Sequence, residues 1–244
     1  MMTTKQTYKT GLGTSDADSI TLLGHDLATE ILGKYSFGEL SYYLITKRRP
    51  TPGQLVMFEA VLASLADHGF TPTAIAARLT YASAPDSLQG ALAAGLLGGG
   101  SRFLGVTEDC AHFLARELKE IGDAPTTQDG WDAAALNAVQ RQRDIGKFVP
   151  GLGHPVHKQG DPRTPVLIAM AREQGLFGSH LSLFEAIGRV HAQVLGKTLP
   201  LNGAGVCGAV LADAGIPMGV MRGVALLARC AGLLGHLVEE QTDP

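Results

Sequence analysis

The loop VPGLGHPVHKQGDPR, residues 149–163, contains residue types that bind anions and move protons. Gly151 and Gly153 permit positive φ angles and let backbone N–H groups approach an anionic or amide-rich ligand. His154 follows them and can hold or pass a proton near neutral pH. Arg163 lies at a predicted helix start, where the helix dipole disfavours a cation, so we expect it to meet a carboxylate. The same composition fits a rigid surface loop with a solvated arginine.

Two further candidates lie outside this loop. Arg229 interrupts the apolar stretch 219–238, and a buried arginine needs an anionic partner. A planar, permanently charged guanidinium suits the carboxylates of a small acid better than a lysine does. His68 follows a predicted helix. Judged from its residue type and position alone, it would cap the end of that helix and bind no ligand.

Four segments resemble parts of the citrate synthase family, in the same order along the chain. GLGHPVHKQGDPR resembles the family signature of Gly-x-Gly-His, a short spacer and Asp-Pro-Arg. LASLADHG and the helices after it resemble the approach to the family's active-site turn. NGAGVCGAVLADAGIP resembles its Asn-Val-Asp segment, and VALLARCAGLLGHLVEEQ its terminal arginine-containing helix. The similarity spans residues 10–241 and is to the short form, which includes citryl-CoA lyases and part of ATP-citrate lyase.

This resemblance implies an all-α, citrate synthase-like fold with an active-site cleft between two helical lobes. Residues 1–104 and 200–244 would form the large lobe, and residues 105–199 the small, CoA-binding lobe. The resemblance also implies a homodimer that binds an acyl-CoA and a small carboxylic acid. A coenzyme A thioester would be the substrate, and neither a metal nor a prosthetic group is expected.

The resemblance also implies roles for individual residues. His68 and His154 match histidines that bind the substrate and act on its carbonyl or hydroxyl group. Arg163 and Arg229 match arginines that hold substrate carboxylates. The residues that match the coenzyme A contacts of the family are Val149, Gly151, Leu152, Gly153 and Asn202.

Two positions depart from the family pattern. Phe103 lines up with the family's enolising histidine, and Ala204 with the aspartate of its Asn-Val-Asp segment. Neither side chain can act as a base or donate a hydrogen bond to an enolate oxygen. Arg102 and Glu108 are the predicted catalytic substitutes, the first for an enolate oxygen and the second as acid or base. Glu108 fits equally well in the first turn of a helix.

These assignments predict a carbon–carbon lyase that resembles citryl-CoA lyase and cleaves a carboxylated hydroxyacyl-CoA. His154, together with His68, would take the proton of the substrate hydroxyl group. Two alternatives stay open: a catalytically silent protein that binds coenzyme A or carboxylates, and a hydrolase of thioesters or diketones. His157 is expected at the surface, with the coenzyme A phosphates as an alternative neighbour.

The elements that position these residues are nearly all predicted helices. Thr51 and Thr71 each precede a proline, which is typical of a helix start. Ser36 and Glu39 have the spacing of a capping box. Residues 16–34 alternate between polar and apolar before they become helical, and few segments have the pattern of a strand.

Several predicted helices contain mostly alanine and glycine, including ALAAGLLGGG and NGAGVCGAVLADAG. Their small side chains allow helix backbones to approach closely and leave room for a ligand. Another helix is expected to start at Pro162, with Asp161 as its cap.

The composition is that of a folded protein without a strongly charged surface. Of the 244 residues, 45% are hydrophobic and 18% charged, which excludes wholesale disorder. No basic block indicates a nucleic-acid partner. The three cysteines are widely spaced, so we predict neither a disulfide nor a zinc site and expect a cytoplasmic protein. The N-terminus lacks the apolar core of a signal peptide. Arg222, Arg229 and His236 predict a buried helix at 219–238, and no membrane partner.

Overall fold

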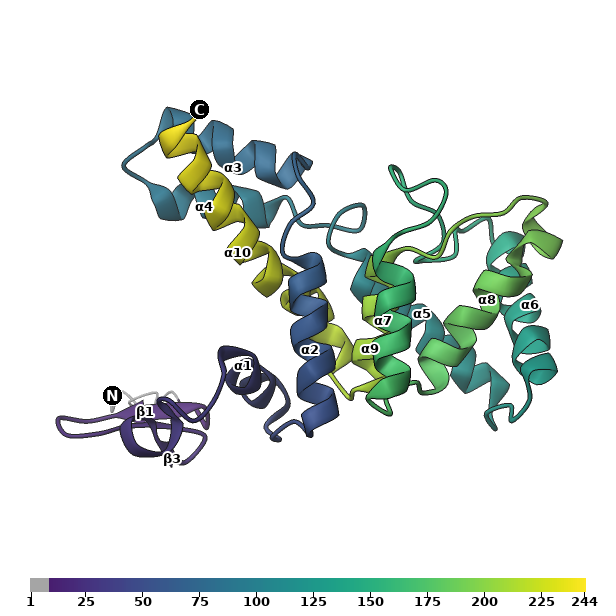
Figure 1. Cartoon of the computed structure of the whole chain (residues 1–244), viewed down its shortest axis with the longest axis horizontal. Coiled ribbons are helices and arrows are strands. Elements are labelled where there is room, and N and C mark those ends of the chain that lie inside the picture. The colour runs from purple at the N-terminus through teal and green to yellow at the C-terminus, as the bar shows by residue number, and fades with distance from the viewer. Residues whose placement is uncertain (1–8) are drawn as a thin grey trace, which may run out of the picture.

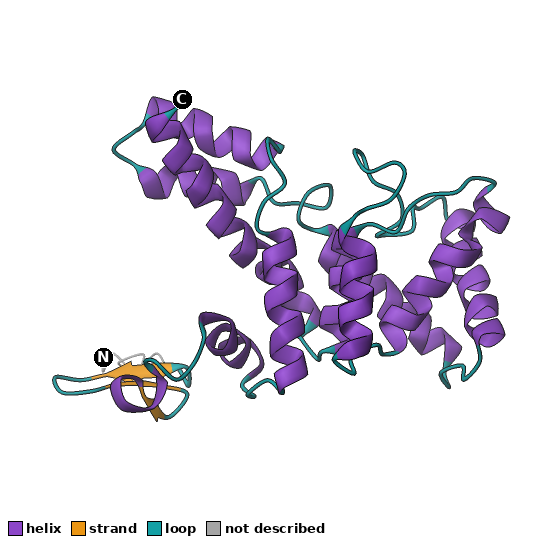
Figure 2. Ribbon diagram, viewed as in Figure 1, coloured by secondary structure: helices purple, strands orange, loops and turns teal. Residues whose placement is uncertain are grey.

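The computed structural model describes residues 9–244 and shows a helical molecule with a small β-sheet near its N-terminus (Figures 1 and 2). The predicted all-α class is confirmed. A short 3-10 helix, η2 (Met218–Val220), precedes the last helix. The α-helices are α1 (Phe37–Thr46), α2 (Pro52–Leu65), α3 (Pro72–Ser83), α4 (Leu88–Leu97), α5 (Val106–Ile121), α6 (Gln128–Asp144), α7 (Arg163–Glu173), α8 (Ser179–Leu195), α9 (Gly203–Asp213) and α10 (Met221–Thr242).

The N-terminal segment forms an arm rather than the expected helix. Its three antiparallel strands lie in the order β1 (Gly13–Ser15), β2 (Ile20–Leu22) and β3 (His25–Asp26). A five-residue π-helical turn, η1 (Leu27–Ile31), follows and is the helical part of residues 16–34. Strands this short contain too few residues for a clear alternating pattern. Figure 1 shows the arm beside α1 and apart from the other helices.

Local capping chemistry determines where several helices begin. Thr51 forms a complete capping box at the start of α2, and the Thr71 side chain accepts a backbone N–H at the start of α3. Ser36 caps α1 by accepting the N–H of Glu39. The reciprocal half of that predicted box is missing, because the Glu39 carboxylate pairs with Arg49 instead.

One large core joins α1, α2, α5 to α9 and the first half of α10, and its largest fully buried side chains include Tyr42, Phe58, Phe113 and Phe184. It takes side chains from both predicted lobes, whose boundaries remain a prediction. A smaller core lies where α3, α4 and the second half of α10 meet. Arg229 lies on α10 between the parts of the helix that serve the two cores.

Two glycines allow the helices to cross in close contact, as predicted for the small-residue segments. A Cβ atom on Gly208 of α9 would lie 2.1 Å from the carbonyl oxygen of Thr107 in α5. A Cβ atom on Gly232 of α10 would lie 2.0 Å from the carbonyl oxygen of Ala66, just after α2. These contacts fix α9 and α10 against the segments that carry the candidate site.

The helical segment Met218–Thr242, which contains α10, is long and apolar enough to cross a membrane. Within this fold its buried residues, among them Arg229, Leu233 and Leu237, face the two cores. Only about a third of the apolar stretch is buried, so the buried helix predicted for 219–238 is found only in part.

Candidate active site

A cavity of about 330 Å³ brings together the four residues on which the predicted substrate site depends. His68 follows α2, His154 belongs to the loop before α7, Arg163 begins α7, and Arg229 comes from α10. Among the described residues, no aspartate or glutamate lines this cavity. Its other lining residues are Leu65, Phe70, Thr71, Pro72, Thr73, Arg102, Phe103, Leu104, Val106, Thr107, Pro155, Val156, Asn202 and Ala204.

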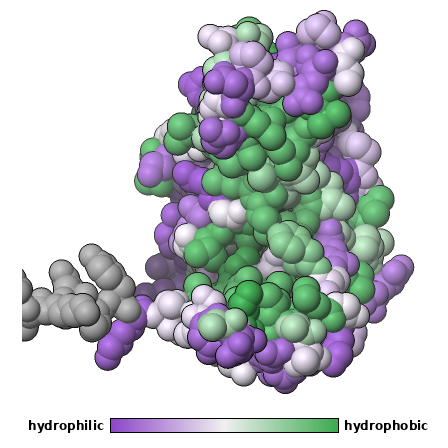
Figure 3. Space-filling view, turned by 90° about the vertical axis from the view of Figure 1, so that its left-hand side faces the viewer, coloured by the Kyte–Doolittle hydropathy of each residue, from purple (hydrophilic) through white to green (hydrophobic). Residues whose placement is uncertain are grey.

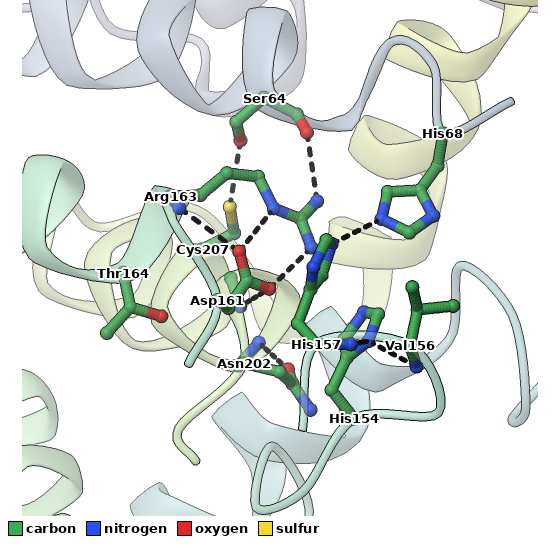
Figure 4. A network of polar contacts seen from close by, with 12 residues as sticks. Ser64, His68, His154, Val156, His157, Asp161, Arg163, Thr164, Asn202 and Cys207 are labelled. Carbon is green, nitrogen blue, oxygen red and sulfur yellow. Dashed lines mark hydrogen bonds and ion pairs between the residues drawn. The ribbon is translucent and has the colours of Figure 1, made fainter. Parts of the chain in front are cut away.

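Arg163 meets a carboxylate of its own chain. Its Nε and Nη2 atoms donate to the two carboxylate oxygens of Asp161, at 3.0 and 2.7 Å (Figure 4). Its Nη1 atom donates to the carbonyl oxygen of Ser64 at 3.1 Å. A guanidinium has five N–H donors, so these bonds leave two for a ligand. The carboxylate expected beside Arg163 is therefore that of Asp161, two residues upstream. The helix α7 begins at Arg163, one residue after the expected start at Pro162.

Asp161 is held in its ionised form. Burial alone would raise its pKa, but hydrogen bonds from Arg163 and from the backbone N–H of Gly203 hold the pKa well below its usual range. The bond from Gly203 is 2.7 Å long and ties the start of α9 to the start of α7. Asp161 thus acts as a structural anion beside the cavity rather than as a proton acceptor.

Arg229 is a buried cation with little internal compensation. It is 4% exposed, and its Nε atom has no hydrogen-bond partner among the described residues. The nearest carboxylate oxygen, on Asp67, is 4.0 Å from Nη1, and the Thr71 hydroxyl is 3.5 Å away. Burial lowers the pKa of Arg229, but an arginine stays charged at neutral pH. A buried charge with such weak partners marks a place for an anionic ligand.

The hydrogen bonds of His154 determine which of its nitrogens carries a proton. Its Nδ1 atom accepts the backbone N–H groups of Val156 and His157, at 3.0 and 2.9 Å. The neutral ring therefore carries its proton on Nε2 and is a hydrogen-bond donor there. Burial and the neighbouring His157 lower the pKa of His154, which favours this neutral form. His154 can therefore donate a hydrogen bond from Nε2, whereas its Nδ1 lone pair is already occupied.

His157 lies inside this group, whereas the sequence placed it at the surface. It is half-buried, and its Nε2 atom lies 3.1 Å from Nε2 of His68. The centroids of the His154 and His157 rings are 4.4 Å apart. The sequence signal was the His-x-x-His spacing, which becomes meaningful only when the chain turns between the two residues. Burial and the charge of Arg163 lower the pKa of His68.

The two predicted catalytic substitutes lie in different surroundings. Arg102 is exposed and lines the cavity together with Phe103 and Ala204. Glu108 does not line it. The carboxylate of Glu108 accepts the backbone N–H of Arg222 at 3.0 Å and lies 3.6 Å from the guanidinium of the same residue. Glu108 thus stabilises the contact between α5 and α10. It lies in the first turn of α5, as the alternative interpretation of the sequence predicted.

Backbone polar atoms of the glycine loop form hydrogen bonds that hold the fold. Gly153 donates to the carbonyl oxygen of Pro200 at 2.7 Å, and the carbonyl oxygen of Gly153 accepts from the Asn202 side chain at 2.7 Å. Gly151 has a φ of +84°, and a Cβ atom there would lie 2.7 Å from the ring of Phe184. The loop is therefore rigid, and Asn202 is the side chain that clamps it.

Two of the four predicted coenzyme A residues of this loop border a second cavity, and Gly151 and Gly153 do not. This cavity, of about 480 Å³, is lined by Val149 and Leu152 and by three basic residues, Arg143, Lys147 and Lys197. Its other lining residues are Val139, Gly146, Phe148, Val194, Leu195, Gly196 and Leu199. Phe148 is 92% exposed, so a flat apolar ring and several cations meet at one opening.

Comparisons with known proteins give matches over most of the chain. The family model of the citrate synthase C-terminal domain matches residues 13–244. The citrate synthase of Deinococcus radiodurans is 29% identical over 211 residues, which are 82% of this chain and 51% of that protein. A probable ATP-citrate synthase of Caenorhabditis elegans is 28% identical over 83% of this chain and 19% of its own length. The chain thus spans about half the length, or less, of these curated relatives.

Solved structures give a similar result. The citryl-CoA lyase of Hydrogenobacter thermophilus has a TM-score of 0.85 and 30% sequence identity, covering 98% of this chain and 88% of that one. The ATP citrate lyase of Methanothrix soehngenii, solved with citrate and coenzyme A, has a TM-score of 0.79 and 22% identity, covering 97% of this chain and 39% of its own. At that identity the second likeness shows the fold alone.

Proposed function

The chain belongs to the citrate synthase family, and from this premise we propose that it cleaves a carbon–carbon bond in a carboxylated hydroxyacyl-CoA, as a citryl-CoA lyase does. The similarity to a citryl-CoA lyase over 98% of the chain supports this choice within the family. The chemistry of the first cavity supports it independently, because its charged groups are cations beside imidazoles.

The observation that carries the proposal is the buried guanidinium of Arg229. A fold tolerates an almost unpartnered buried cation when a ligand supplies the missing charge. A carboxylate between Arg229 and the two free N–H groups of Arg163 would satisfy both. The Thr107 hydroxyl, fully buried and also without a hydrogen-bond partner among the described residues, lines the same cavity and adds a neutral polar contact.

The imidazoles then divide the chemistry of the hydroxyl group. His154 donates from Nε2 to the substrate oxygen and stabilises the negative charge that develops as the carbon–carbon bond breaks. His68 takes the proton of that hydroxyl group. Arg102, which lines the cavity together with Phe103, would face the thioester oxygen of the departing enolate. This division changes the role that the sequence suggested for His154.

Coenzyme A would lie along the loop that joins the two cavities. Leu152 borders the second cavity and His154 borders the first, so an extended ligand can follow the backbone between them. Arg143, Lys147 and Lys197 offer cations to its phosphates, and Phe148 offers a ring to its adenine. The thioester end would then reach the imidazoles and guanidinium groups.

We also propose that the protein is a homodimer. Figure 3 shows a broad apolar area on the side of the molecule that carries the arm, α3, α4 and α10. Helices on that side expose large apolar side chains, including Leu79, Leu97 and Leu234. Contiguous exposed apolar surface of this kind is typical of a protein–protein interface.

A coupled assay with citryl-CoA tests the lyase proposal. Wild-type protein is expected to release acetyl-CoA and an oxoacid in equal amounts. Arg229→Gln should raise KM at least tenfold, since hydrogen bonds to a charged group contribute about 1.5–3 kcal/mol. Arg222→Gln, on the same helix but outside the cavity, is the matched control and should leave KM within about twofold. Equal KM values in the two variants would contradict the assignment of Arg229.

Two other outcomes would identify the alternatives. The cavity contains no carboxylate among the described residues, and this favours a silent binding protein as the second candidate. Calorimetric binding of coenzyme A without turnover of any hydroxyacyl-CoA would support it. Release of free coenzyme A without an oxoacid would indicate a thioester hydrolase.

A further inference from the structure

His157 contacts both histidines that line the first cavity, without lining the cavity itself. Its backbone N–H donates to Nδ1 of His154 at 2.9 Å, and its ring nitrogen Nε2 lies 3.1 Å from Nε2 of His68. We infer that His157 is a positioning residue that makes His68 the acid–base group of the site and holds His154 as a donor. This inference rests on the proposed lyase function.

The first step of the argument is that the cavity offers one usable proton acceptor. Its titratable lining residues are His68, His154 and three arginines, Arg102, Arg163 and Arg229. Arginine does not give up its proton at neutral pH. The lone pair of His154 at Nδ1 already accepts two backbone N–H groups. His68 is therefore the imidazole left to accept a proton from a substrate.

The second step concerns the pair of rings. A neutral imidazole has one N–H and one lone pair, so a hydrogen bond between two Nε2 atoms requires one donor and one acceptor. With His157 as acceptor, His68 carries its proton on Nε2 and keeps a free lone pair on Nδ1. When Nδ1 then takes a proton, the Nε2–H bond to His157 becomes charge-assisted and stabilises the cation.

The charges around the pair explain why a partner is needed. Arg163 from α7 and Arg229 from α10 oppose a positive charge on His68, and Asp161 favours it. Asp67, next to His68, is occupied by His236 at 2.9 Å. A charge on His157 itself would also oppose protonation of His68.

In the proposed cleavage, His68 of this pair takes the proton of the substrate hydroxyl and returns it to the product. The hydroxyl proton moves to Nδ1 of His68 while the carbon–carbon bond breaks and its electron pair passes into the thioester enolate. The oxygen becomes the carbonyl of the oxoacid and accepts the Nε2–H of His154. The enolate carbon then takes the proton back from His68, which leaves an acyl-CoA and a neutral pair.

Nitrogen NMR of protein labelled with ¹⁵N-histidine tests the inference without any substrate. Wild-type His68 is expected as the Nε2–H form. His157→Leu should convert it to a mixture of both neutral forms, and His157→Gln, whose amide oxygen can accept the same bond, should restore it. His154 should stay in the Nε2–H form in all three proteins, because its partners are backbone groups. A His68 signal that is the same in wild type and His157→Leu would overturn the inference.

Kinetics supply the second measurement. His157→Leu should lower kcat at least tenfold, leave KM within about twofold, and move the acid limb of the kcat profile to lower pH, because the cation of His68 loses its acceptor. His157→Gln should recover most of kcat. A purely structural role would leave the pH profile in place. If no CoA thioester is cleaved, the proposed function fails, whereas the NMR result still decides the histidine pair.

A metal site is the rival explanation for three clustered imidazoles. Ring nitrogens of His68, His154 and His157 lie within 4.8 Å of one another, which is close enough for one ion. Coordination through Nε2 of His154 would require that atom to lose its proton. Stoichiometric Zn²⁺ binding by calorimetry that is abolished by His154→Ala would overturn the inference, and its absence would support it.

Discussion

At the scale of single residues, Asp161 is the group on which the geometry of the cavity depends most directly. Its carboxylate holds the guanidinium of Arg163 on one side and accepts the backbone N–H of Gly203 on the other. A Cβ atom on Gly203 would lie 2.5 Å from Nε of Arg163, so glycine allows this close approach. One ionised side chain therefore joins the starts of α7 and α9. It also orients Arg163, which we propose binds the substrate.

Asp161→Asn should weaken this junction at neutral pH. We expect a loss of about 1.5–3 kcal/mol in the free energy of unfolding, because charge-assisted hydrogen bonds are replaced by neutral ones. The folded-state pKa is depressed, so the wild-type contribution is complete above the unfolded-state pKa of about 3.9 and is lost as pH falls through the folded-state value. Urea unfolding at pH 7 and at pH 3 measures the difference between wild type and variant. A gap that does not narrow at pH 3 would contradict this account.

The same residue shows how far sequence reasoning extends. The position of Arg163 predicted that it would meet a carboxylate, and this is correct because helix-dipole chemistry is local. The sequence could not show that this carboxylate is Asp161. It also could not place His157 against His68, since 89 residues separate them and their contact depends on how α2 and the loop pack. Glu108 looked catalytic in the sequence because its partner, Arg222, is 114 residues away.

At the scale of elements, the start of α9 connects helix stability to the glycine loop. Asn202 caps α9 by accepting the N–H of Gly205 at 2.8 Å through its side-chain oxygen. Its side-chain nitrogen donates to the carbonyl oxygen of Gly153 at 2.7 Å. The two ends of one amide thus have separable functions, which a pair of substitutions can distinguish.

Asn202→Asp should keep the cap and lose the clamp on the loop. An aspartate oxygen caps a helix as well as an asparagine oxygen does, but it cannot donate to Gly153. Asn202→Ala removes both and should cost about 0.5–2 kcal/mol more in the free energy of unfolding than removal of the clamp alone. Both variants should weaken coenzyme A binding in calorimetry. Wild-type affinity in Asn202→Asp would show that the clamp does not shape the ligand site.

Helix crossings give a second prediction at this scale. Gly232→Ala would place a methyl group against the backbone oxygen of Ala66, and overpacking of this kind costs about 1–3 kcal/mol. Gly223→Ala on the same helix meets nothing within 4 Å and should be neutral or gain up to about 1 kcal/mol from helix propensity. Thermal unfolding of both variants provides the comparison. Equal melting temperatures would mean that α10 can shift without cost.

The elements themselves were predictable where their signals are local. The Thr-Pro starts of α2 and α3 were identified correctly, because the cap and the proline act within one turn. The second half of the Ser36 capping box failed, since Arg49, ten residues further along the chain, competes for Glu39. The arm was missed for a different reason: strands of two or three residues are defined by pairing rather than by side-chain alternation.

At the scale of the whole molecule, the fold class followed from the sequence, whereas the homodimer that the family resemblance implied stays a prediction. Apolar periodicity and capping residues identify helices, and the family resemblance orders them. Which faces remain apolar after folding depends on all the packing at once. Leu234 and Val238 of α10 belong to a helix that reads as buried, yet they are 40% and 58% exposed.

The arm strengthens the case that a second copy covers this side. Three short strands with exposed Leu12 and Ile20 bury little of their own surface, and a sheet of this size is marginal without further packing. A hydrogen-bond contact between His25 and Tyr43, at 3.4 Å, links the arm to α1. An arm with so little packing of its strands gains stability if it lies against a neighbouring subunit.

Light scattering after size-exclusion chromatography should therefore give twice the chain mass of 25.6 kDa. The double substitution of Leu234 and Val238 to Glu should produce monomers, because two charges would have to be buried in the apolar interface. Val166→Glu on α7, also at an exposed position, is the matched control and should stay dimeric. Circular dichroism would verify that the double variant is folded. A wild-type monomer, or a double variant that still dimerises, would contradict the proposal that a second copy of the chain covers the apolar side.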